Sequence, residues 1–122
     1  MLKPQPTTHG VQFDLNDIAQ ELRASDAYER EGETARTLTR SADLRTVLVV
    51  IEAGKSISEH HTGVSTTVLT LRGSLRLQLP DRNVELPEGG LLVLAPDLAH
   101  DVYAEVDSTF LLTLGWPEGG GS

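Results

Sequence analysis

Between residues 33 and 114 the sequence alternates short stretches rich in leucine and β-branched residues with clusters of turn residues. Stretches of this length, bounded by glycine, proline and asparagine, are typical of β-strands. No helical periodicity separates them, which argues against a parallel α/β sheet and favours an all-β sandwich or closed barrel. We predict strands at Thr34–Arg40, Leu44–Ala53, Thr66–Arg72, Leu75–Leu79, Asn83–Leu86, Leu91–Leu94, Ala99–Glu105 and Thr109–Leu114.

One helical segment precedes the strands. Apolar residues recur at helical spacing from Leu15 to Leu22, and either Asp14 or Asn16 can cap the start. We expect the helix to end between residues 24 and 28, before Gly32. Its apolar stripe is narrow, as in a helix that lies on the outside of a sheet.

The length of 122 residues predicts a single domain. Residues 1–12 are rich in proline and threonine and are predicted to form a flexible arm. Residues 13–32 are the helical segment, and residues 33–116 are the β-barrel. The glycine-rich tail, residues 117–122, has the composition of a flexible linker and fits both a natural tail and a fusion remnant.

Charge and composition exclude several classes of function. The net charge is −8 and the ten Lys and Arg residues are scattered, so we expect no nucleic-acid binding. There is no cysteine, which excludes disulfides and thiolate metal sites. The longest apolar run, Val47–Ile51, is far shorter than the roughly 20 residues of a membrane helix. The first ten residues lack the apolar core of a secretory signal, so we expect a cytoplasmic protein without membrane contact.

Two short motifs resemble those of the cupin superfamily. The first cupin motif runs glycine, five residues, His-x-His, three or four residues, glutamate, six residues and glycine. Gly54, His60 and Gly73 stand in register with it, whereas Thr62 takes the place of the second histidine and Thr66 that of the glutamate.

The second cupin motif runs glycine, five residues, proline and then a histidine a few residues on. Gly90, Pro96 and His100 match it, with the interval from proline to histidine one residue shorter than usual. The resemblance covers roughly residues 34–116 and is to small stand-alone bacterial cupins. It implies a double-stranded β-helix barrel, or jelly roll, in which His60 and His100 converge on an interior pocket.

The resemblance also implies a divalent metal, since cupins typically hold iron, manganese, nickel or zinc with three histidines and one glutamate. Strand alternation places His60 and Thr62 on one face and His61 on the other, unless a bulge near Gly63 turns His61 inward. Two imidazoles and two hydroxyls make a poor site, because catalytic zinc keeps three protein ligands. The candidate site residues are therefore His60, His100 and His61 as ligands of a weakly held metal, with Thr62 and Thr66 lining the pocket.

Three functions remain open. The first is a barrel that binds a small molecule, with or without a loosely held metal and without a defined catalytic activity. The second is a metal-dependent enzyme, a dioxygenase or isomerase, that uses His60 and His100. The third is a non-catalytic scaffold. The resemblance further implies a homodimer, because small cupins commonly pair through their sheets.

Overall fold

A computed structural model describes residues 10–60 and 63–115, with residues 59 and 60 described by their backbone only. The N-terminal segment forms helices α1 (Leu15–Arg23) and α2 (Asp26–Glu31), where the sequence predicted one. Asp14 caps α1, its side chain accepting a hydrogen bond from the amide of Asp17. The Ser25 hydroxyl caps α2 in the same way, and this second cap is the reason that the segment divides.

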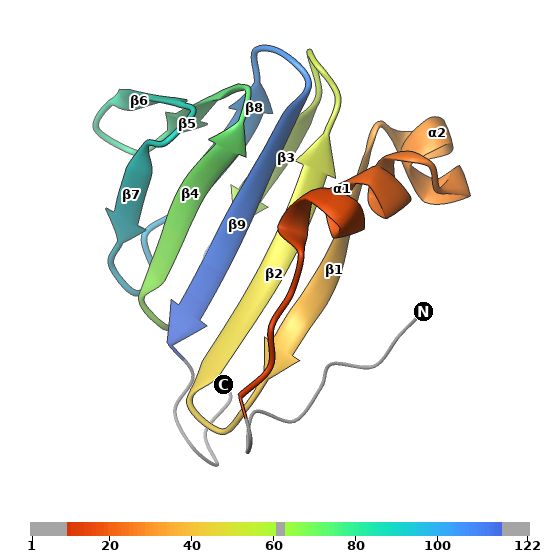
Figure 1. Cartoon of the computed structure of the whole chain (residues 1–122). Coiled ribbons are helices and arrows are strands. Elements are labelled where there is room, and N and C mark those ends of the chain that lie inside the picture. The colour runs from red at the N-terminus through yellow and green to blue at the C-terminus, as the bar shows by residue number, and fades with distance from the viewer. Residues whose placement is uncertain (1–9, 61–62, 116–122) are drawn as a thin grey trace.

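The described strands form two antiparallel sheets (Figure 1). One sheet has the order β1-β2-β9-β4-β7 and the other the order β3-β8-β5-β6. The all-β jelly-roll class predicted from the sequence is therefore confirmed. The strands are β1 (Glu33–Arg40), β2 (Leu44–Ile51), β3 (Ser56–His60), β4 (Thr66–Arg72), β5 (Ser74–Gln78), β6 (Asn83–Pro87), β7 (Leu91–Leu94), β8 (His100–Ala104) and β9 (Ser108–Gly115).

Two apolar clusters hold these layers together. The smaller packs the helices on the outer face of the five-stranded sheet and contains Ala19, Leu22, Leu38, Leu48 and Val50. The larger lies between the sheets and contains Val49, Ile51, Val68, Leu75, Leu77, Leu79, Leu86, Leu94, Val102, Ala104 and Phe110.

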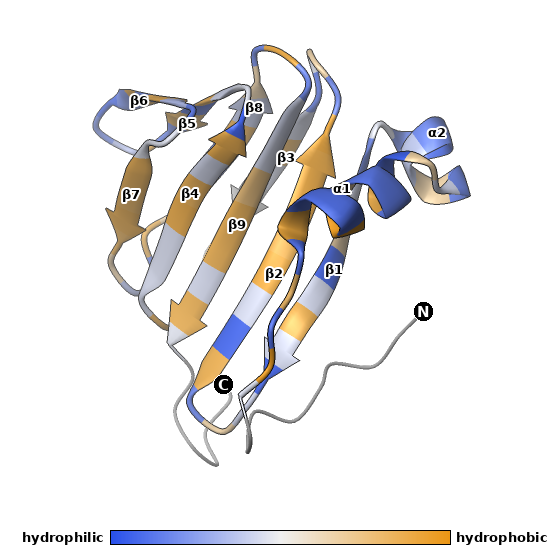
Figure 2. Cartoon of the chain, viewed as in Figure 1, coloured by the Kyte–Doolittle hydropathy of each residue, from blue (hydrophilic) through white to orange (hydrophobic). Residues whose placement is uncertain are grey.

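Strand β2 explains the longest apolar run of the sequence. Leu48 and Val50 face the helices, whereas Val49 and Ile51 face the barrel interior. All four are buried, so the strand is apolar on both faces and shows no alternation. Figure 2 shows the apolar face of α1 lying over this part of the sheet.

Gly73, the closing glycine of the first motif, is required by the turn between β4 and β5. Its φ is +89°, a conformation that L side chains rarely adopt. A Cβ there would lie 2.5 Å from the carbonyl oxygen of Asp107 and collide with the hydroxyl of Ser108. The glycine therefore allows the β4–β5 turn to pack against the start of β9.

In the described ranges, neither α1 nor α2 has the length and apolar character needed to cross a membrane.

Candidate functional site

The barrel interior contains a cavity of about 370 Å³ at the end near β1 and β3. Most of its wall is apolar, as in a small-molecule pocket, whose volume is typically ~300–1,000 Å³. The apolar wall comes from both sheets and consists of Ala35, Val47, Val49, Ile57, Val102, Phe110, Leu112 and Leu114. The polar lining residues are Glu33, Thr34, Thr66 and His100.

His100 is the buried imidazole in this wall. It begins β8, shares the inward parity of Val102 and Ala104, and is only 8% exposed. Its Nδ1 lies 3.1 Å from the carbonyl oxygen of Leu98. Because a carbonyl oxygen only accepts, Nδ1 donates the hydrogen in this bond.

Two further polar residues share the cavity with His100. Thr66 is buried at the start of β4, and its hydroxyl donates to the carbonyl of Val64 at 3.4 Å. Glu33 starts β1 and pairs with Ile51 of β2. Cross-strand partners share a face of the sheet, so Glu33 lies on the side of the barrel interior. Glu33 was not among the site residues predicted from the sequence, although it alternates with Ala35 and Thr37 opposite the inward-facing positions of β2.

The backbone of β3 brings the two predicted histidine positions together. His60 is the register partner of His100 in the β3–β8 ladder. The side chain of His60 lies outside the described part of the chain, as do His61 and Thr62. Convergence of the imidazole rings therefore stays a prediction, as does the lining role of Thr62.

A metal site does not follow from the described residues. Within residues 10–58 and 63–115, no group of three or more His, Asp or Glu side chains could hold a metal ion. His100 and Glu33 line the same cavity, but structural and catalytic metal sites use three or more protein ligands. The described donor set does not fit the divalent metal that the resemblance implies, and that metal remains a prediction that depends on residues 60–62.

Asp101 follows His100 but lies on the other face of β8. It lines a separate hollow on the outer surface, with Tyr103 and Gln78 among its neighbours. Asp101 therefore does not contribute to the interior cavity, in keeping with strand alternation.

Comparison with known proteins identifies the fold. Neither any protein-family model nor any curated protein matches the sequence significantly. Among solved structures, a conserved protein of unknown function from Streptococcus pyogenes matches with a TM-score of 0.73 at 23% identity, over 97% of both chains. A cupin superfamily protein from Desulfitobacterium hafniense matches with a TM-score of 0.72 at 18% identity, over 95% of this chain and 98% of that chain.

A variant of salicylate 1,2-dioxygenase from Pseudoaminobacter salicylatoxidans also matches, with a TM-score of 0.75 at 14% identity. The match covers 84% of this chain and 34% of the dioxygenase. At these identities the likeness concerns the fold. The two-sheet jelly roll, the motif glycines in their turns and these structural matches agree, and the chain has the cupin fold.

Proposed function

We propose that this protein binds a small, mainly apolar molecule in the barrel cavity and holds it by one hydrogen bond to His100. The observation that carries the proposal is a cavity of about 370 Å³ with an apolar wall and one buried imidazole. A concave pocket of this size, with a mainly apolar wall and a few polar groups, is the usual form of a small-molecule binding site.

The polar groups restrict the class of ligand. The imidazole of His100 is the buried polar ring of the wall, so a complementary ligand carries a hydroxyl group that can exchange a hydrogen bond with it. Glu33 adds a carboxyl group to the same cavity, which disfavours an anionic ligand. A neutral ring or short chain with one hydroxyl group meets both conditions.

Isothermal titration with para-cresol and toluene tests the proposal, because the two probes differ only in a hydroxyl group. We expect para-cresol to bind about two- to tenfold more tightly, the usual net worth of one hydrogen bond. His100→Leu should remove this preference while keeping toluene binding. Arg82→Ala, an exposed turn variant, serves as the control and should bind as the wild type does. Equal affinities for the two probes, or no binding of either, would contradict the proposal.

A metal-dependent enzyme is the second candidate, favoured by the pairing of His60 with His100 in one rung of the β3–β8 ladder. Elemental analysis of the purified protein tests it. About one divalent metal per chain, lost in both His60→Ala and His100→Ala, would support the enzyme. Absence of metal would support the binding protein over the enzyme. If neither para-cresol nor toluene bound either, the non-catalytic scaffold would be the function that remains.

A further inference from the structure

A second hollow lies on the outer face of the four-stranded sheet. Its volume is about 260 Å³, and it is lined by Ser56, Ser58, Arg76, Gln78, Asn83, Asp101 and Tyr103. Strand alternation separates it from the barrel cavity, because Asp101 and Tyr103 leave β8 on the face opposite to His100 and Val102. The two sites therefore lie on opposite faces of β3 and β8 and have no lining residue in common.

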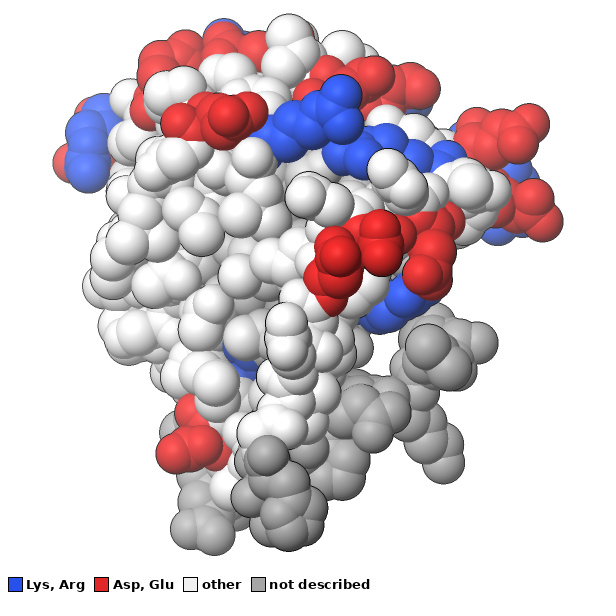
Figure 3. Space-filling view, viewed as in Figure 1, with Lys and Arg blue, Asp and Glu red and all other residues white. Residues whose placement is uncertain are grey.

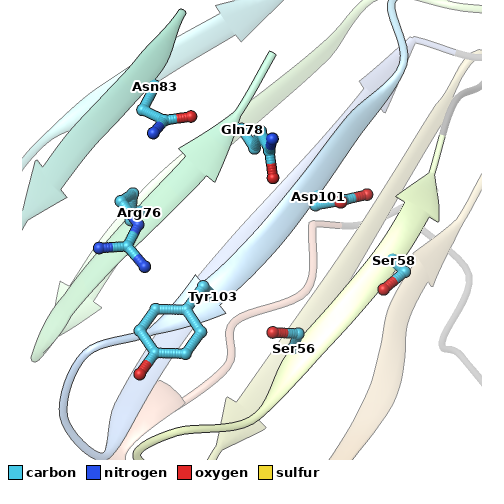
Figure 4. A pocket seen from close by; sticks show the side chains of 7 residues that line it. All are labelled: Ser56, Ser58, Arg76, Gln78, Asn83, Asp101 and Tyr103. Carbon is cyan, nitrogen blue, oxygen red and sulfur yellow. The ribbon is translucent and has the colours of Figure 1, made fainter. Parts of the chain in front are cut away.

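The strand register arranges these polar side chains in two rows. In the first row, Tyr103 of β8 pairs with Ser56 of β3 on one side and Arg76 of β5 on the other. In the second row, Gln78 of β5 pairs with Asp101 of β8 and with Asn83 of β6. Figure 4 shows the side chains standing on the same side of the ribbon, around the space between the rows.

In the first row, Arg76 contacts both the Tyr103 ring and the carboxylate of Glu105. The guanidinium carbon of Arg76 lies 4.6 Å from the centre of the Tyr103 ring, and an Arg76 nitrogen lies 3.7 Å from a carboxylate oxygen of Glu105. Both contacts orient the arginine, and the second one compensates part of its charge.

The charges around the hollow disfavour an ionic ligand. Arg76 is the cation among the lining residues, and it faces Glu105 while Asp101 stands in the second row. An anion would meet these carboxylates on a chain of net charge −8. A metal cation would find a single lining carboxylate, too few for a site. The remaining groups, two amides, two serine hydroxyls and the phenol, both donate and accept hydrogen bonds.

We propose that this hollow binds a neutral polyhydroxylated ligand, a saccharide. Each hydroxyl group of a sugar donates and accepts, which matches the paired donor and acceptor of the Gln78 and Asn83 amides. The carboxylate of Asp101 accepts from sugar hydroxyls in charge-assisted bonds. Strand alternation alone explains polar residues on an outer sheet face. It does not explain a hollow between two rows of such residues beside the contacting side chains of Arg76 and Tyr103.

Titration of the isotope-labelled protein by NMR tests the proposal, with cellotriose, maltotriose and xylotriose as neutral probes and trigalacturonate as the charged counterpart. Probes up to about 20 mM cover the millimolar range of weak binding. We expect at least one neutral probe to shift amide signals of β3, β5 and β8 along the two rows. Asp101→Ala should weaken that binding about tenfold or more, the worth of a charge-assisted hydrogen bond.

Matched variants distinguish binding in the hollow from binding in the barrel cavity, and loss of binding from loss of folding. Asp101→Asn keeps the side-chain shape and should also weaken binding, with a dispersed spectrum showing that it folds. Glu88→Gln, in the exposed turn after β6 and away from the lining residues, and His100→Leu should both keep binding. The proposal is overturned if no neutral probe shifts these signals, if His100→Leu abolishes the shifts, or if trigalacturonate binds more tightly than every neutral probe.

Discussion

A larger side chain placed in the barrel cavity tests whether the cavity has room for additional atoms. Val49 is 5% exposed and lines the cavity. Val68 is fully buried in the same core cluster but does not line the cavity. The substitutions Val49→Phe and Val68→Phe add the same four carbon atoms, one into a space of about 370 Å³ and the other into packed side chains.

The structure predicts opposite effects of the two substitutions on the free energy of unfolding. Burying four more carbons contributes up to roughly 3 kcal/mol at ~0.8 kcal/mol each, and fixing the larger side chain costs about 1 kcal/mol. Val49→Phe should therefore be as stable as the wild type or up to ~2 kcal/mol more stable. Val68→Phe has no space for the ring and should lose ~1–3 kcal/mol.

Urea unfolding followed by circular dichroism measures both values, and we expect the two variants to differ by roughly 1–5 kcal/mol, with Val49→Phe the more stable. Val49→Phe should also lose para-cresol binding, because the ring occupies the space that the ligand needs. Equal destabilisation by the two substitutions would refute the reasoning, since it would mean that Val49 is packed as closely as Val68.

Three further predictions concern the turns, the helices and the assembly. Gly73 and Gly54 both have a positive φ, +89° and +85°, so alanine at either position adds about 1–2 kcal/mol of backbone strain. At Gly73 the added Cβ would also collide with the backbone of Asp107 and Ser108, whereas at Gly54 it would contact nothing. Urea unfolding should show Gly73→Ala as the costlier of the two, and equal losses would contradict this. Burial raises the pKa of Tyr28 above 10.0, so its neutral phenol stabilises the fold fully below pH 10 and that contribution is lost as the pH rises through the folded-state pKa. Above pH 10 the free energy of unfolding should therefore fall less steeply with pH in Tyr28→Phe than in the wild type. An identical pH dependence in both proteins would contradict the prediction. We propose that the homodimer implied by the sequence resemblance buries Leu91 and Val93 of β7, which are 59% and 65% exposed. Figure 3 shows a broad face without charged residues over the five-stranded sheet. Sedimentation velocity should then find a dimer that becomes a monomer on changing both residues to Lys, whereas a wild-type species of 13.2 kDa would contradict it.

The sequence predicted those strands whose burial leaves a strong pattern. Strand β4 lies at Thr66–Arg72 as expected, because its inward positions Thr66, Val68 and Thr70 are all buried. Strand β3 received no range from the sequence, although His60 was expected on a strand or its edge, because Ile57 is the one large apolar residue of β3 and the strand lies at an edge of its sheet. A period of two is hard to detect in a strand that gives one side chain to the core.

The candidate sites were predicted only in part, for a related reason. His100 could be found because Gly90 and Pro96 fix its distance from a turn. Glu33 and the outer hollow depend on which residues of distant strands stand opposite one another. That pairing is a property of the sheet register, which a local pattern of residues does not determine.

The irregularity in β3 shows how strongly the interior site depends on register. Ile57 pairs with Val102 and His60 pairs with His100, so three residues of advance along β3 correspond to two along β8. A regular ladder continuing from Ile57 would have placed Glu59 opposite His100. Because of this extra residue, His60 and not Glu59 pairs with His100 in the β3–β8 ladder. The sequence allowed a bulge near Gly63, whereas the register shift lies earlier, between Ile57 and His60, and it brings the backbone of His60 rather than that of Glu59 opposite His100.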